Sequence, residues 1–102
     1  MMRVLVVGQS ARDVAAASRV AAGRGAQVRH VETFADALNE LRAGRGADVL
    51  LVEVGLDIGY VTSALRRERI FLPVVAYGIG AEPRSAVAAI KAGAHDFLSF
   101  PP

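Results

Sequence analysis

Glu53 is the residue whose type and surroundings are best suited to chemistry. It comes directly after the apolar run 49–52 (VLLV), which is typical of a buried strand. Because an unpaired carboxylate is costly inside a core, we expect Glu53 to lie where that strand ends and a site could begin. Its carboxylate could be a catalytic acid, a metal ligand, a phosphoryl acceptor or the remnant of one. Asp57 is the only other acid nearby, and its expected role is to cap the next helix.

The two histidines give weaker indications of a site. His30 and His95 fall in predicted strands, and neither has a partner at the spacing that metal ligands use. No serine lies in a local nucleophile motif, and the sequence forces no pair of acids together. We therefore expect both histidines at the surface or at strand edges, and we assign no catalytic and no metal-binding residue.

A dinucleotide fold is a second interpretation of the turn after the first strand. That strand ends at Gly8, and the second strand is followed by Glu32, which could contact a ribose. The turn at residues 8–13 (GQSARD) lacks the glycines that let a backbone approach a pyrophosphate. Gly78 and Gly80 follow a later strand, but no third glycine comes at the required spacing. We expect no cofactor.

Composition limits the class of protein. The chain has 102 residues, enough for one domain with a core, and 53% of them are hydrophobic. Cysteine is absent, which excludes disulfide chemistry and suits a cytoplasmic location. No apolar run approaches the roughly 18 residues of a membrane span. The net charge is only +2 and the cations are scattered among acids, so we expect neither a membrane nor nucleic acid as a direct partner.

The elements that must position Glu53 follow from the hydrophobic pattern and from helix-capping signals. Strands are predicted at residues 3–7, 27–31, 48–53, 73–77 and 95–99. Capping boxes at Ser10 and Thr33 begin the first two helices, which end near Ala22 and before Gly44. A weaker helix is predicted at 60–69, and Pro83 is suited to the first turn of a fourth helix that ends at Ala92.

The alternation of strands and helices predicts a parallel sheet with helices on both faces. Such sheets place their sites at the carboxyl ends of the strands. Glu53 ends the third predicted strand and therefore lies where a site is expected.

Three stretches resemble the receiver domains of bacterial response regulators: residues 3–7 (RVLVV), 46–53 (GADVLLVE) and 73–102, which contains PVVAYG and AIKAGAHDFLSFPP. The resemblance covers the whole chain. Within the family it is greatest for the first domain of flagellar, sigma-54-dependent transcription activators of the FlbD type, as the loops GQSARD and GLDIGY and the double proline indicate. It implies an α/β, flavodoxin-like (CheY-like) fold with five parallel strands in the order 2-1-3-4-5. It also implies that residues 1–102 form one domain that stops before the family's fifth helix.

Carried over position by position, the resemblance implies a degenerate phosphorylation pocket. Receivers hold magnesium with an acidic pair after the first strand, where this chain has Gly8 and Gln9. Their phosphoryl-accepting aspartate corresponds to Glu53. Their hydroxyl residue after the fourth strand corresponds to Gly78, and the lysine before the final proline corresponds to Phe100. One carboxylate beside a glutamine is a poor site for a hard cation, and nothing here neutralises a phosphoryl group in transfer.

Two interpretations of Glu53 then remain. The side chain could imitate a phosphorylated aspartate permanently, but imitation would engage the hydroxyl and the lysine, which are both missing. We favour a relic of a phosphorylation site whose carboxylate is structural or solvated.

A candidate partner-binding or switch surface lies on the fourth predicted helix and the fifth strand. Arg84, Ala88 and Lys91 share one side of that helix, and Phe97 occupies the position of the family's switching aromatic. The simpler interpretation is a solvated helix face beside a core phenylalanine.

The expected function is therefore a non-enzymatic, phosphorylation-independent regulatory input domain of a flagellar transcription regulator that acts through protein contact. The resemblance implies a FliX-type regulator as its partner. A working phosphoacceptor that uses Glu53 or Asp57 is the alternative, and a small-ligand binder of flavodoxin-like fold is a third possibility. We also expect this fragment to self-associate, because either alternate set of residues on the fourth and fifth strands is largely apolar.

Overall fold

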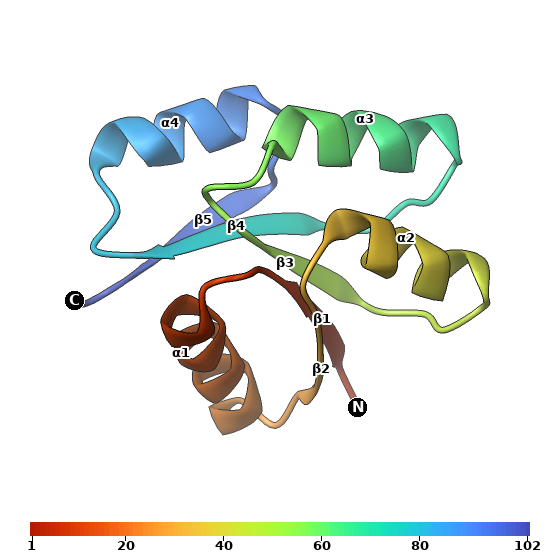
Figure 1. The fold of residues 1–102 in the computed structure, drawn as a ribbon, viewed down its shortest axis with the longest axis horizontal. Coiled ribbons are helices and arrows are strands. Elements are labelled where there is room, and N and C mark those ends of the chain that lie inside the picture. Colours follow the sequence, from red (N-terminus) through yellow and green to blue (C-terminus); the bar gives the residue numbers. More distant parts are fainter.

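The computed structural model describes residues 1–102, in which five strands alternate with four helices (Figure 1). The strands are β1 (Arg3–Val7), β2 (Gln27–Val31), β3 (Val49–Glu53), β4 (Val74–Ile79) and β5 (Asp96–Phe100). The helices are α1 (Ala11–Gly23), α2 (Phe34–Arg42), α3 (Ile58–Arg67) and α4 (Pro83–Lys91). None of these helices combines the length and the apolar composition that a membrane crossing requires.

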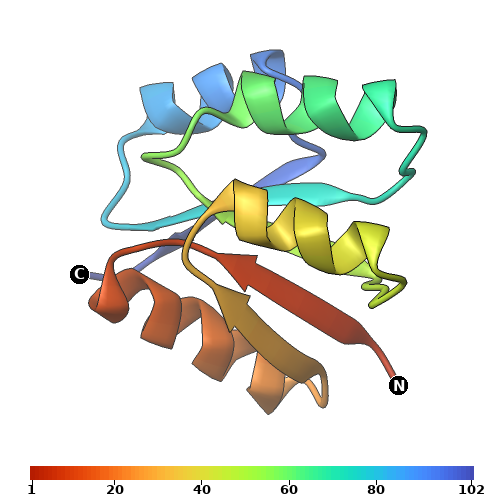
Figure 2. The same cartoon turned by 45° about the vertical axis from the view of Figure 1, so that its right-hand side comes forward.

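The strands form one parallel sheet in the order β2-β1-β3-β4-β5, which confirms the predicted fold and strand order. Helix α1 covers one face of the sheet, and α2, α3 and α4 cover the other (Figure 2). All five strands run the same way, so their carboxyl ends share one edge of the sheet. That edge carries the end of β3, and with it Glu53.

Two apolar clusters hold the layers together. The larger lies under α2, α3 and α4 and contains fully buried residues of the inner strands, such as Leu5, Leu50 and Ala76. The smaller lies under α1 and includes Val6, Leu51 and Tyr77. Neighbouring strand residues thus point to opposite faces, as a sheet buried on both sides requires.

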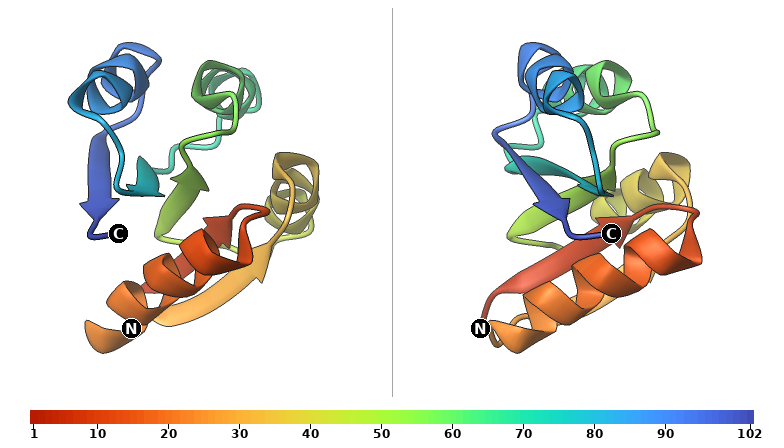
Figure 3. Two further views of the ribbon diagram at one scale, coloured as in Figure 1. Left: turned by 60° about the vertical axis from the view of Figure 1, so that its left-hand side comes forward. Right: turned by 90° about the vertical axis from the view of Figure 1, so that its left-hand side faces the viewer.

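The α1 face of the sheet is incompletely covered where it reaches β4 and β5. A groove of about 630 Å³ opens there between Val20 of α1 and the half-buried Val75 and Leu98 of the strands. The side views of Figure 3 show α1 as the one helix on this side of the sheet. Alternate residues of β4 and β5 point to opposite faces of the sheet. Val74 and Ala76 are buried under α2, α3 and α4, so Val75 and Leu98 are the residues that face the groove.

The local signals explain where the helices begin. The side chains of Ser10 and Thr33 accept hydrogen bonds from backbone N–H groups three residues later, at 3.4 and 3.1 Å, as expected of the caps of α1 and α2. The predicted start of the third helix was wrong by two residues. Asp57 caps α3 by accepting the Tyr60 N–H at 3.0 Å, so the helix begins at Ile58.

The boundaries of the last two strands also differ from the prediction. β4 continues two residues past Tyr77, because Gly78 and Ile79 pair with the end of β5. β5 itself lies one residue later than expected and ends at Phe100. Both strands therefore extend further towards the edge that carries Glu53.

Candidate functional site

Glu53 lies at the carboxyl end of β3, half-buried, and its carboxylate points to the loop between β1 and α1. One carboxylate oxygen accepts the Ser10 N–H at 3.1 Å, and the other accepts the Gln9 N–H at 3.4 Å. Hydrogen bonds to a charged acceptor are stronger than neutral ones. The carboxylate is thus a structural tie between β3 and the loop.

The same loop is also held from β2. The Gly8 N–H donates to the Val31 carbonyl at 3.1 Å, and the Gly8 carbonyl lies 2.9 Å from Nε2 of His30. A carbonyl can only accept, so Nε2 is the protonated nitrogen in this contact. His30 is exposed, as expected, but it has a defined partner that its sequence position did not indicate. The backbone groups of the loop therefore find their partners within the protein.

Tyr77 is the residue of this region that the sequence analysis missed. It lies opposite Glu53 in the β3–β4 register and is fully buried in the cluster under α1. Its hydroxyl donates to the Val7 carbonyl at 3.3 Å. Burial, with smaller contributions from the charges of Glu53 and Asp13, raises the pKa of the Tyr77 hydroxyl above its ordinary value.

The Tyr77 hydroxyl takes up the space beside Gly8. A Cβ at Gly8 would overlap that hydroxyl and would lie 3.1 Å from Cβ of Glu53 and from a methyl group of Val14. Any side chain at position 8 must therefore displace its neighbours. In the sequence, Gly8 stood out only because receivers have an acid there. In the structure, packing requires a glycine at this position.

Gly78 and Phe100 complete the predicted pocket positions. Gly78 lies within β4 and not after it, and a Cβ there would meet a methyl group of Val54 at 3.0 Å. Phe100 ends β5 and packs against Tyr77, with ring centroids 6.3 Å apart. The structure therefore brings Gly8, Gln9 and Glu53 together, while Phe100 joins the apolar cluster under α1.

The residues around Glu53 do not fit magnesium. Both carboxylate oxygens face backbone N–H groups, which repel a cation and cannot ligate it. A hard cation needs several oxygen ligands, and it could gain Glu53 only if the loop first released the carboxylate. Asp57 uses one carboxylate oxygen to cap α3, and no group of three or more acids, histidines or cysteines lies close enough together to hold a metal ion.

The candidate partner surface on α4 is exposed. Arg84, Ala88 and Lys91 all face solvent, although Arg84 forms an ion pair with Glu82 at 2.6 Å. α4 buries only Ala89 of its nine residues. Phe97 is half-buried and packs against the larger core cluster.

The chain is similar in sequence to a transcriptional regulator. It is 48% identical over 101 residues to the transcriptional regulatory protein FlbD of Caulobacter vibrioides, a match that covers 99% of this chain and 22% of FlbD. The chain thus spans about a fifth of the length of that relative. No family model matches the chain.

Solved structures of receivers have the same fold. A response regulator from Chloroflexus aurantiacus superimposes with a TM-score of 0.81 at 22% identity, over 96% of this chain and 84% of that one. The signal receiver domain of NarL from Mycobacterium tuberculosis superimposes with a TM-score of 0.73 at 25% identity, over 96% of this chain and 82% of that one. NtrX from Brucella abortus gives 0.73 at 25% identity, over 97% of this chain and 23% of NtrX.

Proposed function

Since the chain belongs to the receiver domains of response regulators, we propose that it is the input domain of a FlbD-like transcriptional regulator and acts by protein contact without accepting a phosphoryl group. The similarity to FlbD supports the proposal that the chain is a domain of a transcriptional regulator. The geometry around Glu53 supports the part that concerns phosphorylation.

The single observation that carries the proposal is the engagement of Glu53 by the loop after β1. A phosphoryl acceptor must present a free carboxylate oxygen, with cations nearby to neutralise the transferred group. Here both oxygens of Glu53 are bonded to backbone N–H groups. At the position where receivers place a lysine, Phe100 contributes an apolar ring to the packing of Tyr77.

Glu53 then replaces the metal as the link between β3 and the loop. The receivers that this chain resembles hold magnesium with an acidic pair of the first loop. In this chain a carboxylate joins directly to the N–H groups of that loop, and His30 holds it from the other side. The domain would therefore keep one conformation of the loop whether or not magnesium is present.

The output of such a domain must depend on a surface that a partner can reach. The exposed side of α4, with Ala88 and Lys91, is our candidate, and the exposed apolar residues Val87 and Ile90 lie beside them. A FliX-type flagellar regulator, in the cytoplasm, is the partner that the resemblance suggests. The proposed role is non-enzymatic.

Incubation with acetyl phosphate and magnesium, followed by mass spectrometry of the intact chain, tests the proposal. We expect no gain of one phosphate, while a receiver that carries the usual aspartate gains it under the same conditions. A stable phosphate on Glu53 or Asp57 would show that this is a working phosphoacceptor and would refute the proposal.

A further inference from the structure

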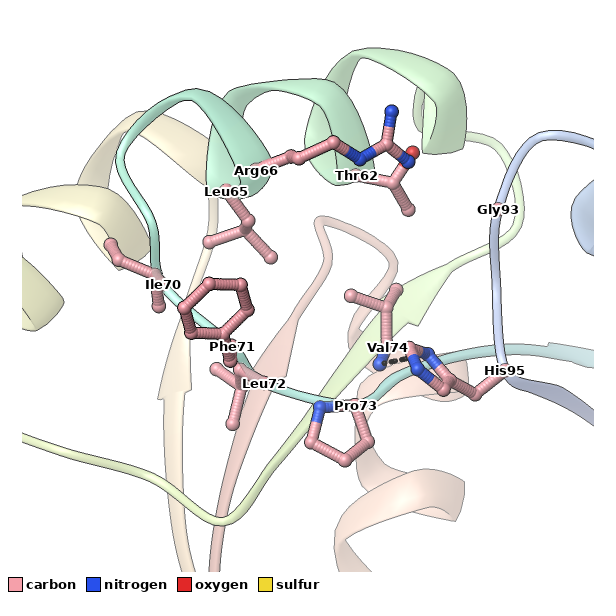
Figure 4. Close-up of a pocket in the computed structure, with 10 residues that line it drawn as sticks. All are labelled: Thr62, Leu65, Arg66, Ile70, Phe71, Leu72, Pro73, Val74, Gly93 and His95. Carbon is pink, nitrogen blue, oxygen red and sulfur yellow. Dashed lines mark hydrogen bonds between the residues drawn. The ribbon is translucent and has the colours of Figure 1, made fainter.

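A second hollow opens at the edge of the sheet opposite Glu53. It has a volume of about 550 Å³ and lies between the end of α3, the loop from α3 to β4 and the turn from α4 to β5 (Figure 4). Leu65 and Val74, both buried, form its base, and Phe71 and Leu72 come from the loop. Because these residues lie at the amino ends of the strands, the hollow is separate from the site around Glu53.

The wall of this hollow is apolar, and part of it is in contact with water. Phe71 is 88% exposed, which is far more than Leu65 at 3%. The exposed ring therefore lies beside a concave apolar surface, as Figure 4 shows. An apolar side chain placed there would remove both the ring and the hollow from water, and buried aromatic anchors of this kind dominate the energy of protein interfaces.

The rim of the hollow is positively charged. Arg66 borders it, and Arg67 and Arg69 follow in the same segment, where none of the three forms an ion pair. The one acid among them, Glu68, is held by Arg42 through two hydrogen bonds, one of them 2.8 Å long. That pairing lowers the pKa of the Glu68 carboxyl. The guanidinium group of Arg66, which lines the hollow, is therefore free to meet an acid of another molecule.

The opposite side of the hollow offers a hydrogen-bond donor. Nδ1 of His95 accepts the Val74 N–H at 3.2 Å, so in the neutral ring the hydrogen is on Nε2. Nε2 has no partner within the protein. The hollow thus combines an apolar centre with a hydrogen-bond donor on one side and the positive charge of Arg66 on the other.

We propose that this hollow binds an apolar side chain carried by an acidic segment of a partner protein. The apolar side chain would insert between Phe71 and Leu65, and a carboxylate beside it would meet Arg66. Leucine, phenylalanine and proline line the hollow, so its centre suits a side chain and not a phosphate. The proposal does not depend on the phosphorylation of Glu53, which lies at the other edge of the sheet.

A titration followed by amide chemical shifts tests this proposal. The probe is a short peptide, blocked at both ends, in which two leucines are flanked by glutamates. We expect shifts at residues 65–72 and 93–95. The same peptide with lysines for the glutamates should bind at least about tenfold more weakly, as charge repulsion at the rim predicts.

Two variants with exposed side chains locate the site without disturbing the core. Phe71→Ala should remove most of the apolar contact, and Arg66→Glu should weaken binding of the acidic peptide and improve binding of the basic one. Tyr60→Ala, on an exposed part of the same helix, is the matched control and should bind as the parent chain does. Equal binding of the acidic and basic peptides, shifts centred elsewhere, or tighter binding of a short oligonucleotide would each overturn the proposal.

Discussion

The carboxylate of Glu53 accepts the backbone N–H of Ser10 at 3.1 Å, which joins the end of β3 to the residue that caps α1. The bond connects two parts of the chain that are far apart in sequence. It places the charge of Glu53 at the beginning of a helix, where the helix dipole favours an anion. In this domain Glu53 is therefore a structural tie between β3 and the beginning of α1.

Removal of the Glu53 carboxylate should weaken this tie without unfolding the domain. Glu53→Ala loses both bonds to the loop, so we expect the free energy of unfolding to fall by about 1 kcal/mol. Glu53→Gln keeps an oxygen that can accept and should cost less. Urea unfolding measures both, and Glu32→Ala, which removes an exposed acid, is the control. A loss as small for Glu53→Ala as for Glu32→Ala would mean that the bonds contribute nothing.

Function should be less sensitive to Glu53 than stability is. If the chain is the input domain of a FlbD-like regulator, as proposed, Glu53→Gln in that regulator should leave transcription of its target genes near the level of the parent protein. If this variant abolished transcription while the amount of protein stayed the same, Glu53 would be imitating a phosphorylated aspartate and our interpretation would be wrong.

Position 8 and Tyr77 should be coupled energetically. Gly8→Ala introduces a methyl group where the Tyr77 hydroxyl lies, and we expect a loss of about 1–3 kcal/mol, as for other overpacked sites. Tyr77→Phe should cost about 1 kcal/mol in the parent chain through the lost bond to Val7. In the Gly8→Ala background the same change should cost less or should stabilise. Strict additivity in this double-mutant cycle would contradict the packing described here.

Tyr77 should also make the fold sensitive to alkaline pH. The pKa of its hydroxyl is raised in the folded state, so the folded chain holds this proton more tightly than the unfolded chain does. The contribution is fully present below the unfolded pKa, and it is lost as the pH rises above about 10. Between neutral pH and a pH above about 10, the urea midpoint should therefore fall further for the parent chain than for Tyr77→Phe. Tyr60→Phe, with an exposed ring, should keep the steep decline.

The open groove beside α1 should support self-association. We predict that a second copy of the chain covers Val75 and Leu98 at high concentration, since burial of apolar area contributes about 25 cal/mol per Å². Sedimentation should show dimers whose formation Val20→Glu prevents, because Val20 is an exposed residue of the groove. Val87→Glu, on the exposed side of α4, should have no effect. A chain that is monomeric at every concentration would refute this prediction.

The fold could be predicted from the sequence because its signals are local. Apolar strands, two capping boxes and the proline at the start of α4 each act within a few residues, and strand–helix alternation then requires a parallel sheet. The start of α3 was predicted wrongly although Asp57 was recognised as a cap. A helix begins directly after its cap, which places the start at Ile58.

The site was less predictable because its contacts join distant segments. The position of Glu53 at a strand end followed from the pattern, but its partners in the first loop did not. The importance of Tyr77 was missed, since it depends on the register of β4 against β3 and on the absence of a side chain at Gly8. The signal that could have indicated Tyr77 is a polar aromatic residue within an apolar strand, paired with the acid of the neighbouring strand β3.

The packing of Tyr77 against Gly8 also limits which residues later mutations could place at position 8. A mutation that introduced an acid at position 8 would have to place its side chain in the volume of the tyrosine hydroxyl. A mutation that shortened Tyr77 first would leave a cavity in the cluster under α1 and would lower the stability of the intermediate protein. Either order passes through a less stable protein, so the packing of this cluster disfavours an acid beside Glu53 at position 8.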